Sequence, residues 1–189
     1  RSYHMYIYKL FRALENVSSS TAIIDSSKSV GRALALLGNS NIDAKVIHLV
    51  RDPRGVYYSF QKKNVVTPTK NVYSAALYWS GTNFLGELIK FRYSERVITI
   101  RYEDLVMVPG QTIHRIQTLL GEDLSDLKHK IASGASITRG HIASGNRIRT
   151  QTSSLKIKPD YDWKTRLTFP QKLIICTLCF PLMLAYRYI

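Results

Sequence analysis

The stretch KVIHLVRDPRGVYYSF, residues 45–60, carries the strongest structural signal in this 189-residue sequence. Its first six residues form an almost unbroken apolar run, which predicts a strand buried on both faces of a parallel sheet. Asp52 then offers a side chain that can cap a helix, and Pro53 suits the first helical turn. A strand that leads directly into a helix is typical of α/β proteins, which bind ligands beyond the carboxyl ends of their parallel strands. The stretch therefore predicts a fold class and the edge of the sheet where a ligand would lie.

The rest of the chain alternates in the same way. Two further β-branched runs predict strands: residues 21–25 and 96–101. Apolar residues at helical spacing predict helices in five further segments: residues 3–14, 30–37, 73–91, 109–120 and 173–186. The last segment is shorter than the ~20 residues that a membrane-spanning helix needs, so it predicts a buried terminal helix. We therefore expect an α/β fold with a parallel sheet flanked by helices, and the length fits one domain, residues 1–189.

The composition favours an anionic partner. The formal net charge is +14, and from Lys128 onward eleven Lys and Arg residues face two acidic ones, Asp160 and Asp162. Nucleic acid is not expected, because the sequence lacks a recognition-helix, zinc-binding or RNA-binding signature. The only cysteines, Cys176 and Cys179, cannot complete a four-ligand metal site by themselves and are expected in the core. We therefore expect an anionic ligand and no metal.

Two polar residues flank the predicted start of the helix. Arg51 stands at the carboxyl end of the strand, and Ser59 follows eight residues later. A guanidinium group can bind two phosphate oxygens at once, and a serine hydroxyl could share the same phosphate. Arg54 is expected to point elsewhere, toward the carboxylate of Asp52. The pattern leaves one alternative open, in which Arg51 and Asp52 form a surface ion pair that contributes little to stability.

These residues carry a resemblance to a known family. KVIHLVRDPRGVYYSF resembles the strand–loop–helix with which sulfotransferases that use 3′-phosphoadenosine 5′-phosphosulfate bind the 3′-phosphate of that nucleotide. The resemblance implies that Arg51 and Ser59 hold this phosphate. RYEDLVMVPGQTIHRIQTLLG, residues 101–121, is similar to a later strand–helix element of the family and implies that Tyr102 lies near the adenine. An ordinary aromatic residue at a strand end is the alternative for Tyr102.

Further motifs extend the resemblance from residue 23 to residue 188. Gly145, Asn146 and Arg147, in GNRIR, resemble a glycine-and-basic loop, which implies that they return to the same 3′-phosphate. DYDWKTRLTFPQK, residues 160–172, resembles the Trp–Arg–Leu element that precedes the family's closing helix. The order and spacing of the motifs together imply a sulfotransferase fold, which is similar to that of P-loop nucleotide kinases.

One element of the family has no counterpart here. The family's first strand ends in a P-loop-like turn that holds the 5′-phosphosulfate, and no such turn precedes residue 21. We expect this strand and loop to lie upstream of Arg1, so that residues 1–189 form the C-terminal portion of a single sulfotransferase domain. A relative that has lost catalysis is the alternative.

The transfer chemistry needs a cation near the leaving nucleotide, where negative charge develops. Lys28, on the loop after residues 21–25, is the catalytic candidate, and a solvated loop lysine is the alternative. A general base must accept the proton of the acceptor. Asp25 or a residue upstream could serve, whereas His48 fits the core and His141 fits a role in shaping its loop. No base is assigned.

Four residues near these motifs are expected to be structural. Glu103 and Asp104 would bind backbone N–H groups of the turn that follows them. Trp79 is expected in the core, and Trp163 is expected to anchor the terminal helix.

The resemblance implies an enzyme that transfers a sulfuryl group from 3′-phosphoadenosine 5′-phosphosulfate to a hydroxyl or amine acceptor. HLVRDPR looks closest to carbohydrate sulfotransferases, which implies a glycan acceptor and a place on the lumenal side of the Golgi membrane. Any membrane anchor would then lie upstream of Arg1, and a cytoplasmic location is the alternative. The alternative function is a non-catalytic module that binds the nucleotide or an acidic glycan.

Overall fold

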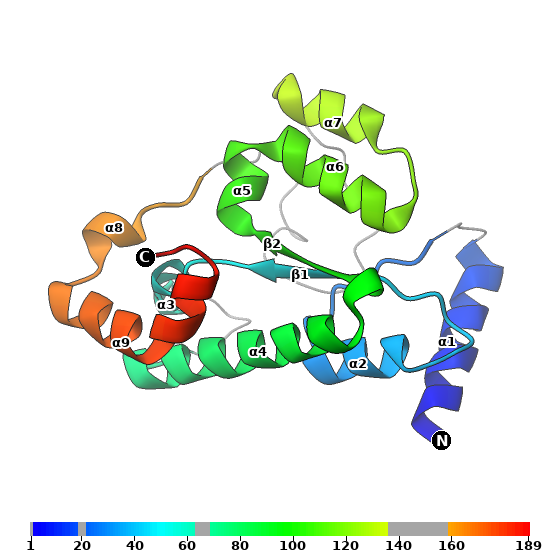
Figure 1. Cartoon of the computed structure of the whole chain (residues 1–189), viewed down its shortest axis with the longest axis horizontal. Helices are drawn as coiled ribbons and strands as arrows, with labels where there is room; N and C mark the ends of the chain where they lie inside the picture. Colours follow the sequence, from blue (N-terminus) through cyan, green and yellow to red (C-terminus); the bar gives the residue numbers. More distant parts are fainter. Residues whose placement is uncertain (1, 19–21, 63–68, 136–158) are drawn as a thin grey trace.

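The computed structural model describes residues 2–18, 22–62, 69–135 and 159–189. Two strands and several helices follow one another along these residues (Figure 1). In chain order they are α1 (Ser2–Ser18), α2 (Val30–Leu37), β1 (Val46–Val50), α3 (Pro53–Gln61), α4 (Val72–Arg92), the 3-10 turn η1 (Ser94–Arg96), β2 (Val97–Arg101), α5 (Tyr102–Met107), α6 (Pro109–Leu120), α7 (Ser125–Ala132), α8 (Trp163–Arg166) and α9 (Phe169–Ala185).

The two strands pair in parallel, with Val46 opposite Val97 and Val50 opposite Arg101. Helices lie on both sides of the pair: α2, α3, α4 and α9 on one side, and α5, α6 and α7 on the other (Figure 1). A parallel pair needs a long crossover, which the helix α4 supplies. The α/β class predicted from the sequence, with a parallel sheet flanked by helices, is confirmed.

Two predictions about strands are wrong. Residues 22–29 contain no strand, and Ile24 is 92% exposed, so the sheet of the described residues has two strands rather than three. Strand β1 is not buried on both faces, because Ile47 and Leu49 are 40% and 52% exposed. A β-branched run supplies only a local preference, and a strand forms where a neighbouring strand accepts its backbone hydrogen bonds.

The opposite face of β1 packs on helix α4. His48 lies against Gly86 so closely that a Cβ at this glycine would stand 2.4 Å from the imidazole Cε1 atom. The ring is mostly buried and hydrogen bonds to Asn83, with 3.0 Å between Nε2 and Oδ1. Because the Asn83 amide also donates to the carbonyl of Trp79 (2.7 Å), its oxygen is left to accept from His48. The predicted core position of His48 is confirmed.

The main core lies between α4 and α9. Its centre is formed by Trp79, Trp163, Ile175, Cys179 and Met183, which are all buried. Trp79 and Trp163 therefore take the structural places predicted for them. Cys179 is buried as expected, whereas its neighbour Cys176 is only partly buried. In the part of the chain that the structure describes, no helix has the length and apolar character needed to cross a membrane.

Helix ends follow the predicted signals. Asp52 caps α3 by accepting from the backbone N–H of Arg54 (2.9 Å), and Pro53 occupies the first turn. Helix α6 begins at Pro109 and is capped after Leu120 by Gly121, whose φ of 73° lies in the left-handed region that favours glycine. The cap at Asp52 fixes the direction in which the chain leaves β1, and this direction positions the site described next.

Candidate functional site

The site begins where both strands end. Arg51 and Tyr102 directly follow β1 and β2, and the parallel register with Val50 opposite Arg101 brings them to the same edge of the sheet. The guanidinium carbon of Arg51 lies 4.8 Å from the centre of the Tyr102 ring. A cation over an aromatic face is held by the ring's quadrupole. Two residues predicted to bind one nucleotide are therefore in contact.

The side chain of Arg51 lies across the first turn of helix α3. A Cβ at Gly55 would stand 3.1 Å from Arg51 Nε and 3.2 Å from Cδ1 of Trp163, so this glycine leaves room for the guanidinium. Ser59 is one helical turn beyond Gly55 and therefore on the same face of the helix, where its side chain is exposed. Ser59 is thus on the side of α3 that Arg51 lies against, and its role in binding a phosphate stays a prediction.

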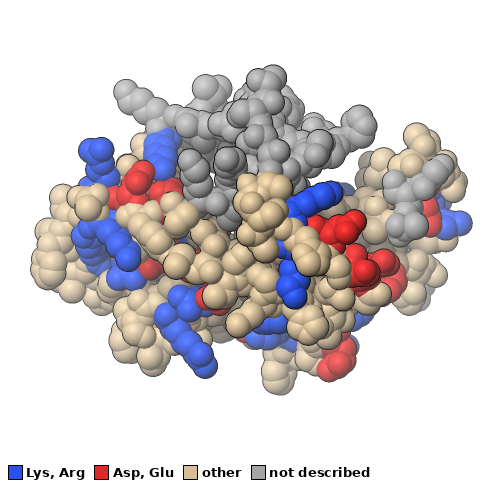
Figure 2. Space-filling model, turned by 90° about the horizontal axis from the view of Figure 1, so that it is seen from above, with Lys and Arg blue, Asp and Glu red and all other residues tan. Residues whose placement is uncertain are grey.

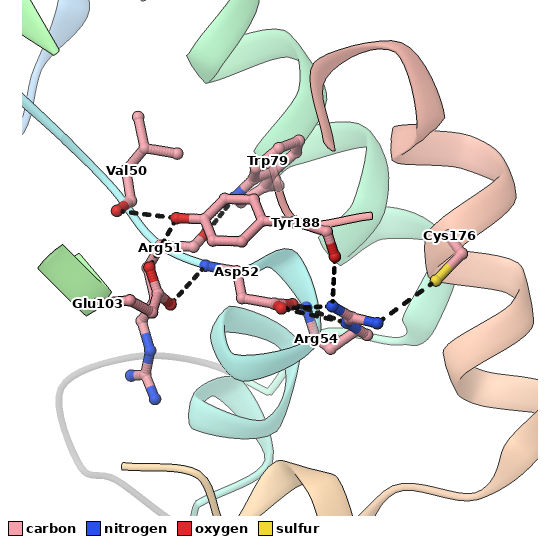
Figure 3. Close-up of polar contacts among 8 residues, drawn as sticks. All are labelled: Val50, Arg51, Asp52, Arg54, Trp79, Glu103, Cys176 and Tyr188. Carbon is pink, nitrogen blue, oxygen red and sulfur yellow. Dashed lines mark hydrogen bonds and ion pairs between the residues drawn. The ribbon is translucent and has the colours of Figure 1, made fainter. Parts of the chain in front are cut away.

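Arg54 takes a different direction from Arg51 (Figure 3). It pairs with Asp52 through two nitrogens, with Nε 2.9 Å from Oδ1 and Nη2 2.6 Å from Oδ2. The hydrogen bond with Asp52 raises the pKa of Arg54 above its ordinary value. Arg54 also donates to the carbonyl of Tyr188 (3.1 Å) and stacks on Trp163. The predicted Arg54–Asp52 contact is confirmed, and the alternative of an Arg51–Asp52 surface pair is wrong because Asp52 is buried against Arg54.

The backbone at Arg51 is fixed from both sides (Figure 3). Trp79 Nε1 donates to the carbonyl of Arg51 (2.9 Å), and the N–H of Asp52 donates to Glu103 Oε1 (3.2 Å). The Tyr188 hydroxyl donates to the other oxygen of Glu103 (2.8 Å), and burial together with this carboxylate raises the pKa of Tyr188. Glu103 is structural, as predicted, but it binds the start of α3 rather than the turn that follows it. The reason is that its side chain, at the start of α5, reaches the N-cap residue of α3, which lies 51 residues away along the chain, so the local sequence does not contain this contact.

Two further charged residues reach Arg51. Asp160 Oδ2 lies 3.2 Å from Arg51 Nη2, and the Asp160 carbonyl accepts from the same nitrogen (3.1 Å). Lys62 Nζ donates to the same Oδ2 atom (3.1 Å) and lies 4.9 Å from the centre of the Tyr58 ring. Burial raises the pKa of Asp160, but the hydrogen bonds from Lys62 and Arg51 outweigh it and leave the pKa below its ordinary value. The edge of the sheet therefore holds two cations that share one carboxylate oxygen.

Sequence reasoning missed Lys62 and Asp160. Lys62 follows Ser59 by three residues, a spacing that keeps both near one face of a helix, so the sequence did contain a signal for it. Asp160 lies 109 residues from Arg51 along the chain, and nothing in the local pattern of either residue predicts their contact.

The structure does not bring Lys28 or Asp25 into this cluster, and it does not describe the remaining predicted ligands. Lys28 lies in the exposed segment 22–29 with a φ of 61°, and its contacts do not include Arg51. Gly145, Asn146 and Arg147 lie outside the described residues, as does His141. Asp25 forms an ion pair with the guanidinium of Arg32, so its carboxylate is not available to accept a proton from an acceptor. Residues 2–18, 22–62, 69–135 and 159–189 contain no group of three or more His, Cys, Asp or Glu side chains that could hold a metal ion.

Positive charge is divided among separate groups on the face seen in Figure 2. Lys and Arg side chains lie at several places on this face, and acidic side chains lie beside many of them. The described part of this face therefore offers localised contacts for an anion rather than one continuous basic patch.

Comparisons with known proteins identify the family. The family model described as "Sulfotransferase family" matches residues 3–126. No curated protein sequence matches the chain. A search of solved structures finds similarity to mouse sulfotransferase SULT7A1 complexed with PAP, at 19% sequence identity and a TM-score of 0.47, with 74% of this chain and 58% of that chain covered. The chain thus spans 58% of the length of that sulfotransferase. On the family match over residues 3–126, the chain belongs to the sulfotransferase family.

Proposed function

We propose that this chain binds 3′-phosphoadenosine 5′-phosphosulfate and takes part in transferring its sulfuryl group to a hydroxyl or amine acceptor. The observation that carries the proposal is the contact between Arg51 and Tyr102 at the carboxyl edge of the sheet. Membership of the sulfotransferase family supports the type of reaction. The arrangement suits a nucleotide because one residue offers charge to a phosphate and the other offers an aromatic surface to a base.

Each residue of the site has a place in this proposal. Arg51 binds the 3′-phosphate through its guanidinium, and Ser59, on the same side of α3, adds a hydroxyl donor. Tyr102 lies beside the adenine. Burial raises the pKa of the Tyr102 hydroxyl despite the nearby charge of Arg51, so the side chain is neutral and does not repel the phosphate.

The reaction is an in-line displacement at sulfur. The acceptor oxygen or nitrogen forms a bond to sulfur, while the bond from sulfur to the bridging oxygen of the 5′-phosphate breaks. The acceptor's proton passes to a general base, and the leaving nucleotide takes the electron pair as negative charge on its 5′-phosphate. Lys28 remains the candidate cation for that charge. It would have to approach from the exposed segment 22–29.

The proposed acceptor is a glycan, and the proposed location is the lumenal side of the Golgi membrane. Both rest on the likeness of HLVRDPR to carbohydrate sulfotransferases. A non-catalytic nucleotide-binding module is the second candidate. It is favoured by the state of Asp25, a candidate base, whose carboxylate forms an ion pair with Arg32.

Calorimetry with adenosine 3′,5′-bisphosphate tests the nucleotide site. The wild-type chain should bind this compound more tightly than adenosine 5′-monophosphate, which lacks the 3′-phosphate. Arg51→Ala should weaken binding of the bisphosphate at least tenfold, because a hydrogen bond to a charged group contributes about 1.5–3 kcal/mol. Equal affinity for the two nucleotides, or an unchanged affinity in Arg51→Ala, would contradict the proposal. A radiolabelled-sulfate transfer assay on glycan acceptors then separates an enzyme from a binding module.

A further inference from the structure

The cluster at Arg51 contains one more cation than the resemblance implied. Lys62, at the end of α3, and Arg51, at the start of the loop before it, both contact a single oxygen of Asp160. All three side chains are partly buried, with exposed fractions of 37%, 21% and 29%, respectively. Two positive charges therefore converge on a site for one anionic group, at the edge of the sheet where a ligand is expected.

The Asp160 carboxylate is a poor match for the two cations, because only one of its oxygens contacts them. Asp160 Oδ2 receives both cations, whereas Oδ1 is buried and has no hydrogen-bond partner among the described residues. A buried acceptor without a donor is costly. The three charges leave a net positive charge, which Asp162 offsets only weakly because it lies 3.9 Å from Lys62 with its side chain 65% exposed. A dianion with three free oxygens matches two cations better than one carboxylate oxygen does.

The backbone of Asp160 does not depend on this ion pair. Its carbonyl accepts from Arg51 Nη2 independently of the carboxylate, at 3.1 Å. The side chain can therefore turn away about its own bonds while the main chain stays beside Arg51. Such a movement would leave the Arg51 guanidinium and the Lys62 ammonium facing the same space.

We propose that Lys62 is a second cationic ligand of the 3′-phosphate that Arg51 binds, and that the Asp160 carboxylate holds this two-cation site until the phosphate displaces it. The inference rests on the proposed nucleotide site and adds two residues to it. It gives the chain an internal competitor, so the affinity for the nucleotide is lower than the two cations alone would provide. The phosphate replaces the carboxylate without any covalent step.

Calorimetry on a set of variants tests the inference, with adenosine 3′,5′-bisphosphate and adenosine 5′-monophosphate as probes. Asp160→Asn should bind the bisphosphate roughly three- to tenfold more tightly than wild type, since two modest ion pairs no longer have to be broken. Lys62→Met should bind it roughly tenfold more weakly, and Lys62→Arg should restore most of the affinity. None of the three changes should alter the affinity for the monophosphate.

Matched controls remove the effects of net charge and folding. Asp43→Asn makes the same charge change as Asp160→Asn at an exposed carboxylate that pairs with Lys45 instead of Lys62 or Arg51. Lys70→Met removes a lysine that, like Lys62, stacks on an aromatic ring, here that of Tyr78 (5.0 Å). Both controls should leave the affinity for the bisphosphate within about twofold of wild type, because exposed charges contribute little. Circular dichroism confirms that each variant is folded before its affinity is compared.

The outcomes distinguish this inference from the proposed function. If the wild type binds the bisphosphate through Arg51 but Asp160→Asn binds equally or more weakly, the displacement of Asp160 is wrong. If Lys62→Met keeps wild-type affinity, Lys62 is not a phosphate ligand. If the wild type shows no preference for the bisphosphate, or Arg51→Ala does not affect it, the nucleotide site itself is wrong and the inference falls with it.

Discussion

The indole nitrogen of Trp79 donates a 2.9 Å hydrogen bond to the backbone carbonyl of Arg51. Helix α4, the longest helix among the described residues, thereby holds the residue on which the proposed nucleotide site depends. Trp79 is itself buried in the core between α4 and α9, so the position of Arg51 is tied to the packing of these two helices.

Trp79→Phe should therefore lower both stability and affinity. The change keeps an aromatic ring but leaves the Arg51 carbonyl without its donor. We expect a loss of about 1–3 kcal/mol in the free energy of unfolding, measured by urea denaturation, and weaker binding of adenosine 3′,5′-bisphosphate. Wild-type values for both quantities would mean that the hydrogen bond does not position Arg51.

Gly55→Ala should weaken nucleotide binding without unfolding the protein. The new Cβ would stand 3.1 Å from Arg51 Nε and 3.2 Å from Trp163 Cδ1, so the guanidinium has to move. We expect roughly a tenfold loss of affinity, comparable to one lost charged hydrogen bond. Gly31→Ala in α2 is the control, because a Cβ there meets nothing within 4 Å. It should leave binding unchanged and stabilise the helix by up to about 1 kcal/mol.

Asp52→Ala should be strongly destabilising. Asp52 caps α3 and pairs with the largely buried guanidinium of Arg54, whose side chain is 18% exposed. Removing one partner of a buried pair leaves an uncompensated charge and costs about 3–5 kcal/mol. The double variant Asp52→Ala/Arg54→Met should lose much less than the sum of the two single changes. Additive losses in urea denaturation would show that the two side chains are not coupled.

Stability should fall as the pH is lowered below 6.5, because of His48. Burial lowers the pKa of His48 below the ordinary value of 6.5, although the hydrogen bond with Asn83 opposes the shift. The unfolded chain therefore binds a proton first. The stability contributed by neutral His48 is complete above pH 6.5 and is lost as the pH falls toward the lower pKa of the folded state.

Urea denaturation between pH 7.5 and pH 5 measures this effect, and His48→Gln is the comparison because it cannot titrate. The carboxylates of Asp25 and Asp160, whose pKa values lie below 3.8, lose their contribution only at more acidic pH. The wild type should lose more stability than His48→Gln over this range. Parallel curves for the two proteins would assign the pH dependence to other groups.

Local signals account for what the sequence predicted well. Residues 45–60 contain the strand, the helix cap at Asp52, the proline of the first turn and the position of Arg51, so each could be inferred from its neighbours. Residues 21–25 have the same β-branched character, but a strand also needs a partner, and no local pattern supplies one. The exposure of Leu49 has the same origin, since burial depends on what covers a face.

The residues of the site were predictable where a local motif marks them, as Arg51 and Ser59 are marked by the strand and helix around them. Tyr102 was placed near the same nucleotide by the family resemblance, and its direct contact with Arg51 was not predicted. Asp160 could not be found in this way, because its contact with Arg51 depends on the path of the chain over 109 residues. The roles of Gly145, Asn146 and Arg147 stay predictions.

The hydroxyl of Tyr188 reaches back to the end of β1 over a separation of 138 residues and meets Glu103 there. On the ribosome, which makes the chain from its N-terminus, Arg51 leaves the exit tunnel long before this tyrosine. The loop at Arg51 acquires its final supports only when the segment carrying Tyr188 has also emerged. A nascent chain therefore passes through a long interval in which the loop at Arg51 lacks the contacts that Tyr188 supplies. Any change that displaces Tyr188 would leave the proposed nucleotide site in that same unsupported condition.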